Sequence, residues 1–325
     1  MLLSLHSFAA DETPRMARFP HAPFPLTGQT LSLLGGAGFV GHALAARLGA
    51  RGARVLIPTR RPEQVRELKL IPGVQLIEAD IFDPATLERL CQSSSAVINL
   101  VGILNERGHD GSGFRRAHVE LTERVIAACQ SAGTPRLLHM SALNADEQGP
   151  SHYLRTKGEA ERKVHAAASN GKLAVVSFRP SVIFGPGDSF LNRFAGLIRR
   201  MPGVFPLARA DARFAPVYVG DVVAAFLHAL ETRELDGQAL DLCGPRDYTL
   251  GELVTYTAQL IDHPLTVLPL PDWAARMQAR VMEYLPGKPF SRDNLASLSL
   301  PSVCPEACPR QPTALEAIAP RYLRR

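Results

Sequence analysis

LLGGAGFVG, the stretch Leu33–Gly41, decides the fold of this chain. The apolar run that ends at Leu34 predicts a buried strand, and the glycines Gly35, Gly38 and Gly41 follow at a G-x-x-G-x-x-G spacing. The apolar residues after them recur at the period of a helix. A strand, a glycine turn and a helix in this order cradle a pyrophosphate, because backbone N–H groups and the positive end of the helix face the anion. We therefore expect a dinucleotide site here, against the alternative of a plain glycine-rich turn.

The second expected strand, Arg54–Thr59, indicates which dinucleotide binds. A site that prefers NAD carries an acidic residue about 20 positions after the first glycine, where it holds the ribose 2′-hydroxyl. No Asp or Glu lies between Gly41 and Glu63, and Arg60 and Arg61 stand at the expected ribose edge. A guanidinium pairs with a 2′-phosphate through two charge-assisted hydrogen bonds. We expect NADP(H) rather than NAD(H); the alternative is that the arginines form a solvated surface patch.

Strands and helices alternate through the first half of the chain, which predicts an α/β fold with a doubly wound parallel sheet of the Rossmann type. We expect a loose extension at residues 1–28, a dinucleotide-binding domain at 29–180, and a smaller, partly interwoven domain for substrate or partner at 181–325. The further expected strands are Val74–Ile77, Ala96–Gly102, Arg136–Met140 and Leu173–Phe178, and the expected helices include Phe114–Ala132 and Ser151–Ala168.

Ligands of such sheets bind beyond the carboxyl ends of the strands. The residues at these ends form the expected cofactor site. They are Gly35, Gly38, Phe39, Val40, Gly41, Thr59, Arg60, Arg61, Asp80, Ile81, Val101, Gly102, Tyr153, Lys157 and Pro180.

Tyr153 and Lys157 are the candidates for chemistry, because residues four apart share one face of a helix. A free phenol titrates near 10, and a lysine ammonium beside it lowers that pKa toward a value useful for proton transfer. We expect Tyr153 to act as the acid or base and Lys157 to hold the nicotinamide ribose, against the alternative of an ordinary surface pair.

Four motifs together resemble the extended short-chain dehydrogenase/reductase superfamily. Besides the glycine turn and Tyr153-x-x-x-Lys157, they are RPSVIFGPG at Arg179–Gly187 and VYVGDV at Val217–Val222. Within that superfamily the chain is similar to the atypical branch related to the 39-kDa accessory subunit of respiratory complex I and its bacterial relatives. The resemblance, which spans about residues 30–325, implies a Rossmann domain with NADP(H) in its cleft and Pro180 near the nicotinamide.

The chain departs from that pattern at two positions. Leu143 stands where active relatives place a catalytic serine, with Ser141 two residues earlier as a stand-in donor. His118 stands where relatives commonly show asparagine. Two functions follow: an oxidoreductase or isomerase acting on a hydrophobic carbonyl or quinone-related substrate, or a non-catalytic NADP(H)-binding accessory protein whose partners belong to a respiratory or quinone pathway.

Composition bears on the partners, the location and the metal content to be expected. The net charge of +5 is mild and no lysine-rich tract or aromatic platform appears, so we expect no nucleic-acid partner. No apolar run reaches the length of a membrane span. The five cysteines are odd in number and scattered, which favours reduced thiols in a cytoplasmic protein, peripheral to the inner membrane at most. Cys304 and Cys308 lack a second ligand pair, so we expect no metal.

The C-terminal part is expected to hold a helix at Phe190–Met201, a strand at Phe214–Val217, and a helix that Asp221 caps. Thr249 and Glu252 form the pattern of a capping box. The segment Pro269–Pro289 carries Trp273, Met277, Val281 and Leu285 at helical spacing. Such a stripe usually packs on the core; the alternatives are a lipid-like substrate pocket or a partner surface.

Overall fold

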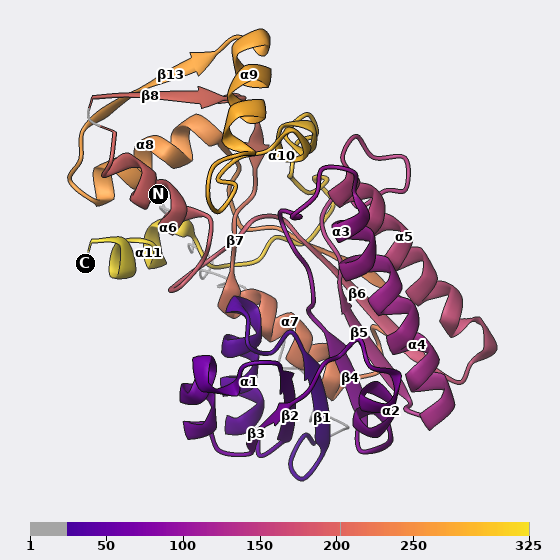
Figure 1. Cartoon of the computed structure of the whole chain (residues 1–325). Helices are drawn as coiled ribbons and strands as arrows, with labels where there is room; N and C mark the ends of the chain where they lie inside the picture. Colours follow the sequence, from indigo (N-terminus) through magenta and orange to yellow (C-terminus); the bar gives the residue numbers. More distant parts are fainter. Residues whose placement is uncertain (1–24, 202, 325) are drawn as a thin grey trace, which may run out of the picture.

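A parallel sheet of seven strands forms the centre of the computed structural model, which describes residues 25–201 and 203–324 (Figure 1). The strand order is β11-β6-β5-β4-β1-β2-β3, and every neighbouring pair is parallel. The order reverses between β1 and β4, which opens a crevice at their carboxyl ends. The expected Rossmann-type fold is confirmed. The strands are β1 (Thr30–Leu34), β2 (Arg54–Thr59), β3 (Val74–Glu78), β4 (Ala96–Asn99), β5 (Arg136–Met140), β6 (Ala174–Pro180) and β11 (Ala239–Leu242).

Helices cover both faces of this sheet, as continuous apolar strands require. On one face, α1 (Phe39–Ala50) and α7 (Val219–Glu231) bury Leu44 and Phe226 in a core shared with β1. The 3₁₀ segment η1 (Pro62–Leu70) adds Leu68 to that core. On the other face lie α2 (Pro84–Gln92), α4 (Leu121–Ala132) and α5 (His152–Ala167), followed by the short turn η3 (Ala168–Asn170).

The expected helix Phe114–Ala132 exists but is not uniform. It begins as α3 (Ser112–Arg115), widens into a π-helical segment η2 (Arg116–Glu120) and continues as α4. His118 lies in this wide turn. Insertions of this kind are frequent at functional sites.

Beyond Pro180 the chain builds a smaller layer of helices and two-stranded sheets, then returns to the main sheet through α7 and β11 (Figure 1). Its strand pairs are β7 (Ile183–Phe184) with β10 (Val217–Tyr218), β9 (Arg213–Phe214) with β12 (Tyr248–Thr249), and β8 (Gly203–Ala208) with β13 (Leu265–Leu270). Its helices are α6 (Leu191–Ile198), α8 (Leu250–Leu260), α9 (Asp272–Met282), α10 (Arg292–Ser297), α11 (Leu315–Ile318) and α12 (Pro320–Leu323).

Beyond Pro180, one of three expected local features is confirmed and two are wrong. The capping box of Thr249 and Glu252 is confirmed at the start of α8. The single strand expected at Phe214–Val217 is wrong, because its two ends belong to β9 and β10 in different sheets. Asp221 does not cap α7, which begins at Val219; its carboxylate instead accepts hydrogen bonds from the N–H and hydroxyl of Thr313 at 3.1 and 2.9 Å.

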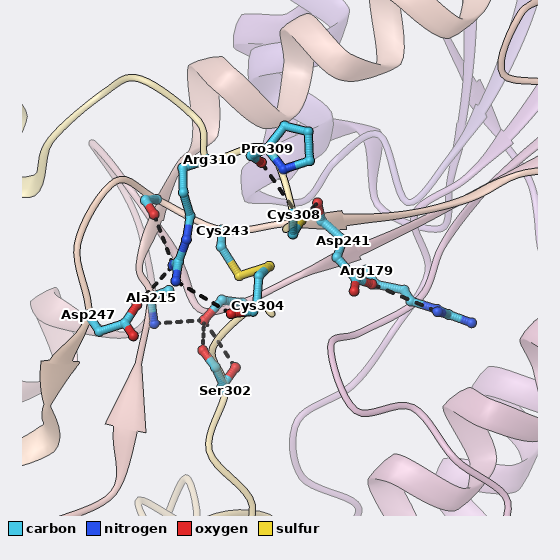
Figure 2. Close-up of a disulfide and its surroundings, with 12 residues drawn as sticks. Arg179, Ala215, Asp241, Cys243, Asp247, Ser302, Cys304, Cys308, Pro309 and Arg310 are labelled. Carbon is cyan, nitrogen blue, oxygen red and sulfur yellow. Dashed lines mark hydrogen bonds and ion pairs between the residues drawn. A yellow bond between two sulfur atoms is a disulfide. The ribbon is translucent and has the colours of Figure 1, made fainter. Parts of the chain in front are cut away.

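A disulfide joins Cys243, just after β11, to Cys304 in the C-terminal segment, 61 residues away (Figure 2). The expectation of reduced cysteines is therefore wrong for this pair, which only the tertiary fold brings together. It holds for Cys91 and Cys129, which are buried thiols with sulfurs 3.8 Å apart.

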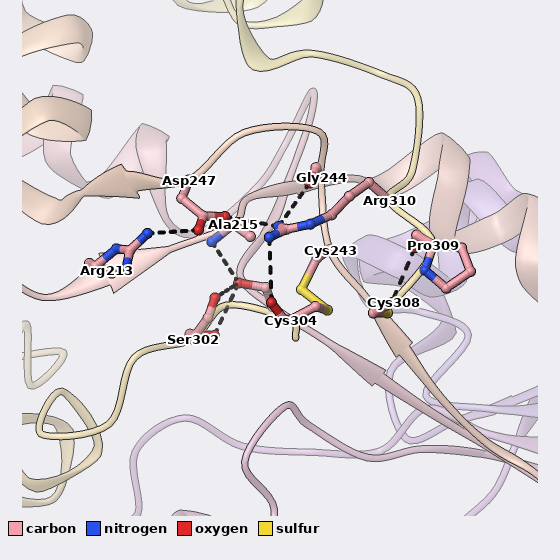
Figure 3. Close-up of polar contacts among 11 residues, drawn as sticks. Arg213, Ala215, Cys243, Gly244, Asp247, Ser302, Cys304, Cys308, Pro309 and Arg310 are labelled. Carbon is pink, nitrogen blue, oxygen red and sulfur yellow. Dashed lines mark hydrogen bonds and ion pairs between the residues drawn. A yellow bond between two sulfur atoms is a disulfide. The ribbon is translucent and has the colours of Figure 1, made fainter. Parts of the chain in front are cut away.

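Arg310 adds hydrogen bonds and an ion pair beside the disulfide (Figure 3). Its guanidinium donates to the carbonyl oxygens of Gly244 and Cys304, at 3.3 and 3.4 Å, and pairs with the carboxylate of Asp247 at 2.8 Å. Asp247 also pairs with Arg213 at 2.9 Å. The C-terminal segment is thus fastened to the end of β11 by a covalent bond and an ion-pair network.

Removing the disulfide should cost stability without changing the fold. We expect the Cys243→Ser/Cys304→Ser double variant to lose about 2–4 kcal/mol of unfolding free energy, because the closed loop no longer constrains the unfolded chain. Urea unfolding in non-reducing buffer measures this, with Cys308→Ser as the control because Cys308 is a free, half-buried thiol. A double variant as stable as the wild type contradicts the expected constraint.

Candidate dinucleotide site and active site

The glycine turn joins β1 to α1 at very close range. Gly35 has a φ of +78°, which favours glycine, and a Cβ there would lie 3.1 Å from the backbone of Leu100 and Val101. A Cβ on Gly41 would lie 2.5 Å from the Cα and carbonyl oxygen of Gly36. The helix therefore starts directly against the turn, and no acidic side chain occupies its first turn. This cradle fits a pyrophosphate, which the backbone N–H groups of Phe39 and its neighbours would hold.

Three arginines lie around the end of β2, the strand next to the glycine turn. Thr59, Arg60, Arg61, Gln64 and Arg107 line a cavity of about 450 Å³, in which no acidic residue takes part. The backbone N–H of Arg61 donates to the hydroxyl of Thr59 at 3.3 Å, which fixes the turn after β2. Arg107 comes from the loop after β4 and was not predicted. Its place in the sequence gave no signal, because the loop reaches this cavity only in the folded chain.

The other expected cofactor residues follow their strands along the same edge. Asp80 accepts from the N–H of Phe82 at 3.0 Å and is exposed after β3, with the half-buried Ile81 beside it. Val101 donates its N–H to the side chain of Asn99 at 3.1 Å. Pro180 ends β6, and its carbonyl oxygen accepts from the N–H of Leu143 at 3.0 Å.

Gly102 brings the loop after β4 against α5. A Cβ at Gly102 would lie 3.1 Å from the ammonium nitrogen of Lys157, so the loop and the lysine are in close approach. The structure thus places the end of β4 and the expected nicotinamide residue Lys157 together.

Tyr153 and Lys157 lie one turn apart on α5, whose first turn is capped by the side chain of Ser151. The ammonium of Lys157 is buried and donates to the carbonyl oxygen of Met140 at 2.9 Å, and burial lowers the pKa of Lys157 to about 8. Burial and the carboxylate of Asp293 raise the pKa of Tyr153 to about 12. The expectation that the lysine lowers the pKa of the phenol is therefore wrong, because burial and Asp293 dominate at Tyr153 while the ammonium donates to Met140.

His118 forms one wall of this region. Its Nε2 accepts from the N–H of Ile103 at 3.1 Å, and its Nδ1 lies 2.9 Å from the hydroxyl of Thr156. These partners assign the proton to Nδ1. Burial and the nearby Lys157 hold the pKa of His118 well below its usual range, so the ring is neutral. The ring stands edge-on to Tyr153 with centroids 5.6 Å apart.

The end of β5 carries polar atoms without partners among the described residues. The hydroxyl of Ser141 is buried and unpaired, as are both ring nitrogens of His139. Leu143 instead packs in an apolar cluster with Ala215, Cys243 and Cys304. The leucine has no polar atom to donate, whereas Ser141, which follows the carbonyl that Lys157 binds, has a hydroxyl with unused hydrogen-bonding capacity.

Asp293 was missed from the sequence. It lies on α10, yet its carboxylate accepts from the backbone N–H groups of His152 and Tyr153 at 2.6 and 3.2 Å. The C-terminal part thereby caps the helix that carries Tyr153. A cavity of about 230 Å³ adjoins this contact, lined by the loop after β4, the start of α5 and the segment before α10, including His152, Arg155 and Arg292.

The fold and the glycine turn define a dinucleotide-binding protein of the Rossmann class. The chain belongs to the NAD dependent epimerase/dehydratase family, whose sequence profile matches residues 31–251. Among solved structures, UDP-glucuronic acid 4-epimerase from Bacillus cereus, in complex with UDP-glucuronic acid and NAD, has a TM-score of 0.66 at 20% identity, covering 85% of this chain and 95% of the epimerase. At this identity the likeness shows the fold.

Curated relatives are similar at higher sequence identity. The NADH dehydrogenase (ubiquinone) 1 alpha subcomplex subunit 9 of Mus musculus mitochondria is 29% identical over 314 residues, which cover 92% of this chain and 81% of the subunit. A ceramide reductase of Caulobacter vibrioides is 27% identical over 242 residues, or 74% of each chain. The resemblance to the complex I subunit and to bacterial reductases is thus confirmed.

Membrane-spanning helices and clusters of metal ligands are both absent from the described residues. No helix there combines the length and the apolar character needed to cross a membrane. No group of three or more potential metal ligands gathers in residues 25–201 and 203–324.

The contact between α1 and the turn gives a test of the cradle. Gly41→Ala should lower the unfolding free energy by about 1–3 kcal/mol, because the new methyl group meets backbone rather than a flexible side chain. Gly196→Ala in α6 is the matched control, since a Cβ there meets nothing within 4 Å; it should gain about 0.5–1 kcal/mol. Thermal and urea unfolding without nucleotide measure both; equal stabilities for the two variants would argue against the tight approach.

Proposed function

We propose that this chain binds NADP(H) and reduces the carbonyl of a hydrophobic substrate, at a location peripheral to the inner membrane. The arrangement of Tyr153 and Lys157 beside the end of β5 carries the proposal. The hydrophobic substrate class rests on the relatives, one of which is named ceramide reductase. When bound, the cofactor supplies or accepts a hydride at the substrate carbon.

The cofactor preference rests on the cavity at Thr59–Arg61. Arg60, Arg61 and Arg107 bring three guanidinium groups to one place, whereas a 2′-hydroxyl would be held by a carboxylate. A 2′-phosphate brings two negative charges that these groups neutralise.

Tyr153 supplies the proton in the proposed reduction. The phenol is protonated at neutral pH, but its raised pKa makes it a weak acid, so proton transfer to the carbonyl oxygen requires a cation beside it. Lys157 would exchange its bond to Met140 for the ribose hydroxyls, where its ammonium stabilises the phenolate left after proton transfer. Ser141 offers the free hydroxyl that holds the substrate oxygen, in place of the donor that Leu143 lacks.

A second candidate is an accessory protein that keeps NADP(H) as a structural ligand within a respiratory or quinone-biosynthetic assembly. Two observations favour it: the similarity to the complex I subunit spans 92% of the chain, and Leu143 replaces a catalytic hydroxyl with an apolar side chain. The experiments below separate the two candidates.

Cofactor preference is tested by titration calorimetry with NADPH and NADH. We expect NADPH to bind at least about tenfold more tightly, and Arg60→Ala/Arg61→Ala to remove that difference, because each charge-assisted bond contributes about 1.5–3 kcal/mol. Arg47→Ala is the control, an exposed arginine on α1 outside the cavity. Equal affinities in the wild type, unchanged in the double variant, would refute the NADP(H) assignment.

The reaction is tested by single-turnover oxidation of bound NADPH against a panel of aldehydes and quinones. Tyr153→Phe should slow turnover by about 10²–10⁴-fold while NADPH affinity stays within about threefold, since only the proton donor is lost. In the wild type, kcat/KM should fall as pH rises through about 8, where Lys157 loses its proton. Tight, non-exchanging NADPH without turnover, together with co-purification with membrane complexes, identifies the accessory protein instead.

A further inference from the structure

Helix α9 turns its large apolar side chains outward. Ala275 and Ala279 form its buried face. Trp273, Met277 and Val281 lie one turn apart and are 68%, 57% and 59% exposed. The expectation that this stripe packs on the core is therefore wrong, because the small alanines make the core contact.

The exposed apolar surface continues beyond the helix. The amide of Gln278 donates to the carbonyl oxygen of Pro206 at 3.0 Å, so α9 lies against the sheet of β8 and β13. Of the eleven large apolar side chains exposed among the described residues, seven gather here, and we call them the α9 face: Val204, Leu268, Trp273, Met277, Val281, Tyr284 and Leu285. Figure 1 shows α9, β8 and β13 at the top of the view, at the end of the C-terminal part farthest from the edge strand β3.

Two arginines border this face. Arg276 and Arg280 are exposed on α9 one turn apart, and neither has an ion-pair partner among the described residues. Among the acidic groups nearby, Asp272 and Asp211 share Arg209, each at 3.8 Å, and the buried carboxylate of Glu283 pairs with Arg292. Arg276 and Arg280 outweigh the one carboxylate left unmatched. The border of the α9 face is therefore net cationic.

This combination fits the surface of an anionic bilayer. Tryptophan and tyrosine are enriched at the level of lipid headgroups, and arginines beside an apolar stripe extend toward lipid phosphates. Large apolar side chains grouped on an exposed surface with a polar border mark an interaction surface. The partner is therefore expected to present apolar and negatively charged groups together.

We propose that the α9 face docks onto a membrane containing anionic phospholipids, with Trp273 and Met277 among the acyl chains and Arg276 and Arg280 at the phosphates. The face connects to the candidate active site, because α9 runs through Glu283 to α10, whose Asp293 caps the helix of Tyr153. The docking deepens the proposed function, since a hydrophobic substrate would be drawn from the same bilayer; it is measured independently of catalysis.

Trp273 is the only tryptophan of the chain and reports on the face directly. Its fluorescence is recorded with two kinds of vesicle. One is phosphatidylcholine with phosphatidylglycerol as about a third of the lipid, and the other is phosphatidylcholine alone. We expect the emission to shift to the blue only with the anionic vesicles, and the shift to weaken as salt screens the arginines. An unshifted emission overturns the proposal. So does a blue emission in buffer alone, which means that another part of the chain or a second copy covers Trp273.

Vesicle flotation tests the residues. Met277→Ser/Val281→Ser and, separately, Arg276→Glu/Arg280→Glu should each reduce the bound fraction at least about fivefold. The controls carry changes of the same kind elsewhere on the exposed surface, one apolar and two basic: Leu70→Ser and Arg47→Glu/Arg321→Glu should bind as the wild type does. Equal losses in test and control variants overturn the proposal.

A catalytic readout separates this proposal from the proposed function. NADPH binding and turnover of a short, water-soluble aldehyde are measured without vesicles in the same variants, and both should match the wild type. Intact turnover with no vesicle binding removes only the docking surface. Vesicle binding without turnover removes only the proposed reaction.

Discussion

The close approach of α1 to the glycine turn is the constraint on which the candidate site depends. Gly41 rests against the backbone of Gly36 with no room for a methyl group, so the start of the helix is fixed relative to the end of β1. Leu44 and Leu48, buried under the sheet, keep the helix in that position. Since β2 is hydrogen-bonded beside β1, Thr59 at the end of β2 is held at a fixed distance from the glycine turn at the end of β1. One ligand can therefore contact both.

The C-terminal part then completes the site rather than standing apart from it. The carboxylate of Asp293 accepts two charge-assisted hydrogen bonds from the first turn of α5, the helix that carries Tyr153. Thr313 binds Asp221 on α7, and the disulfide ties the C-terminal segment to the end of β11. These contacts join segments more than 60 residues apart. Of these contacts, the one made by Asp293 fixes the position of α10 relative to the first turn of α5.

Sequence reasoning succeeded where the signal is local. The strand before Gly35, the helix after it and the capping box of Thr249 follow from period and short spacing, which reflect backbone geometry within a few residues. It failed where partners meet only in the folded chain, as for Asp293 and the pair Cys243–Cys304. It also failed at α9, because a helical period shows that apolar residues share a face and does not show which face is buried.

The unsatisfied polar atoms at the end of β5 bear on the choice between catalysis and a structural role. A buried hydroxyl without a partner costs about 1–3 kcal/mol, so a protein that only stores its nucleotide gains nothing from the hydroxyl of Ser141. The same strand end holds the carbonyl oxygen that anchors Lys157, and a neutral phenol stands one turn away. A hydroxyl, an ammonium and a phenol are the groups that the proposed carbonyl reduction uses. Leu143 packs apart from them among Ala215, Cys243 and Cys304, so the proposed reduction depends on the hydroxyl of Ser141 in place of a donor at position 143.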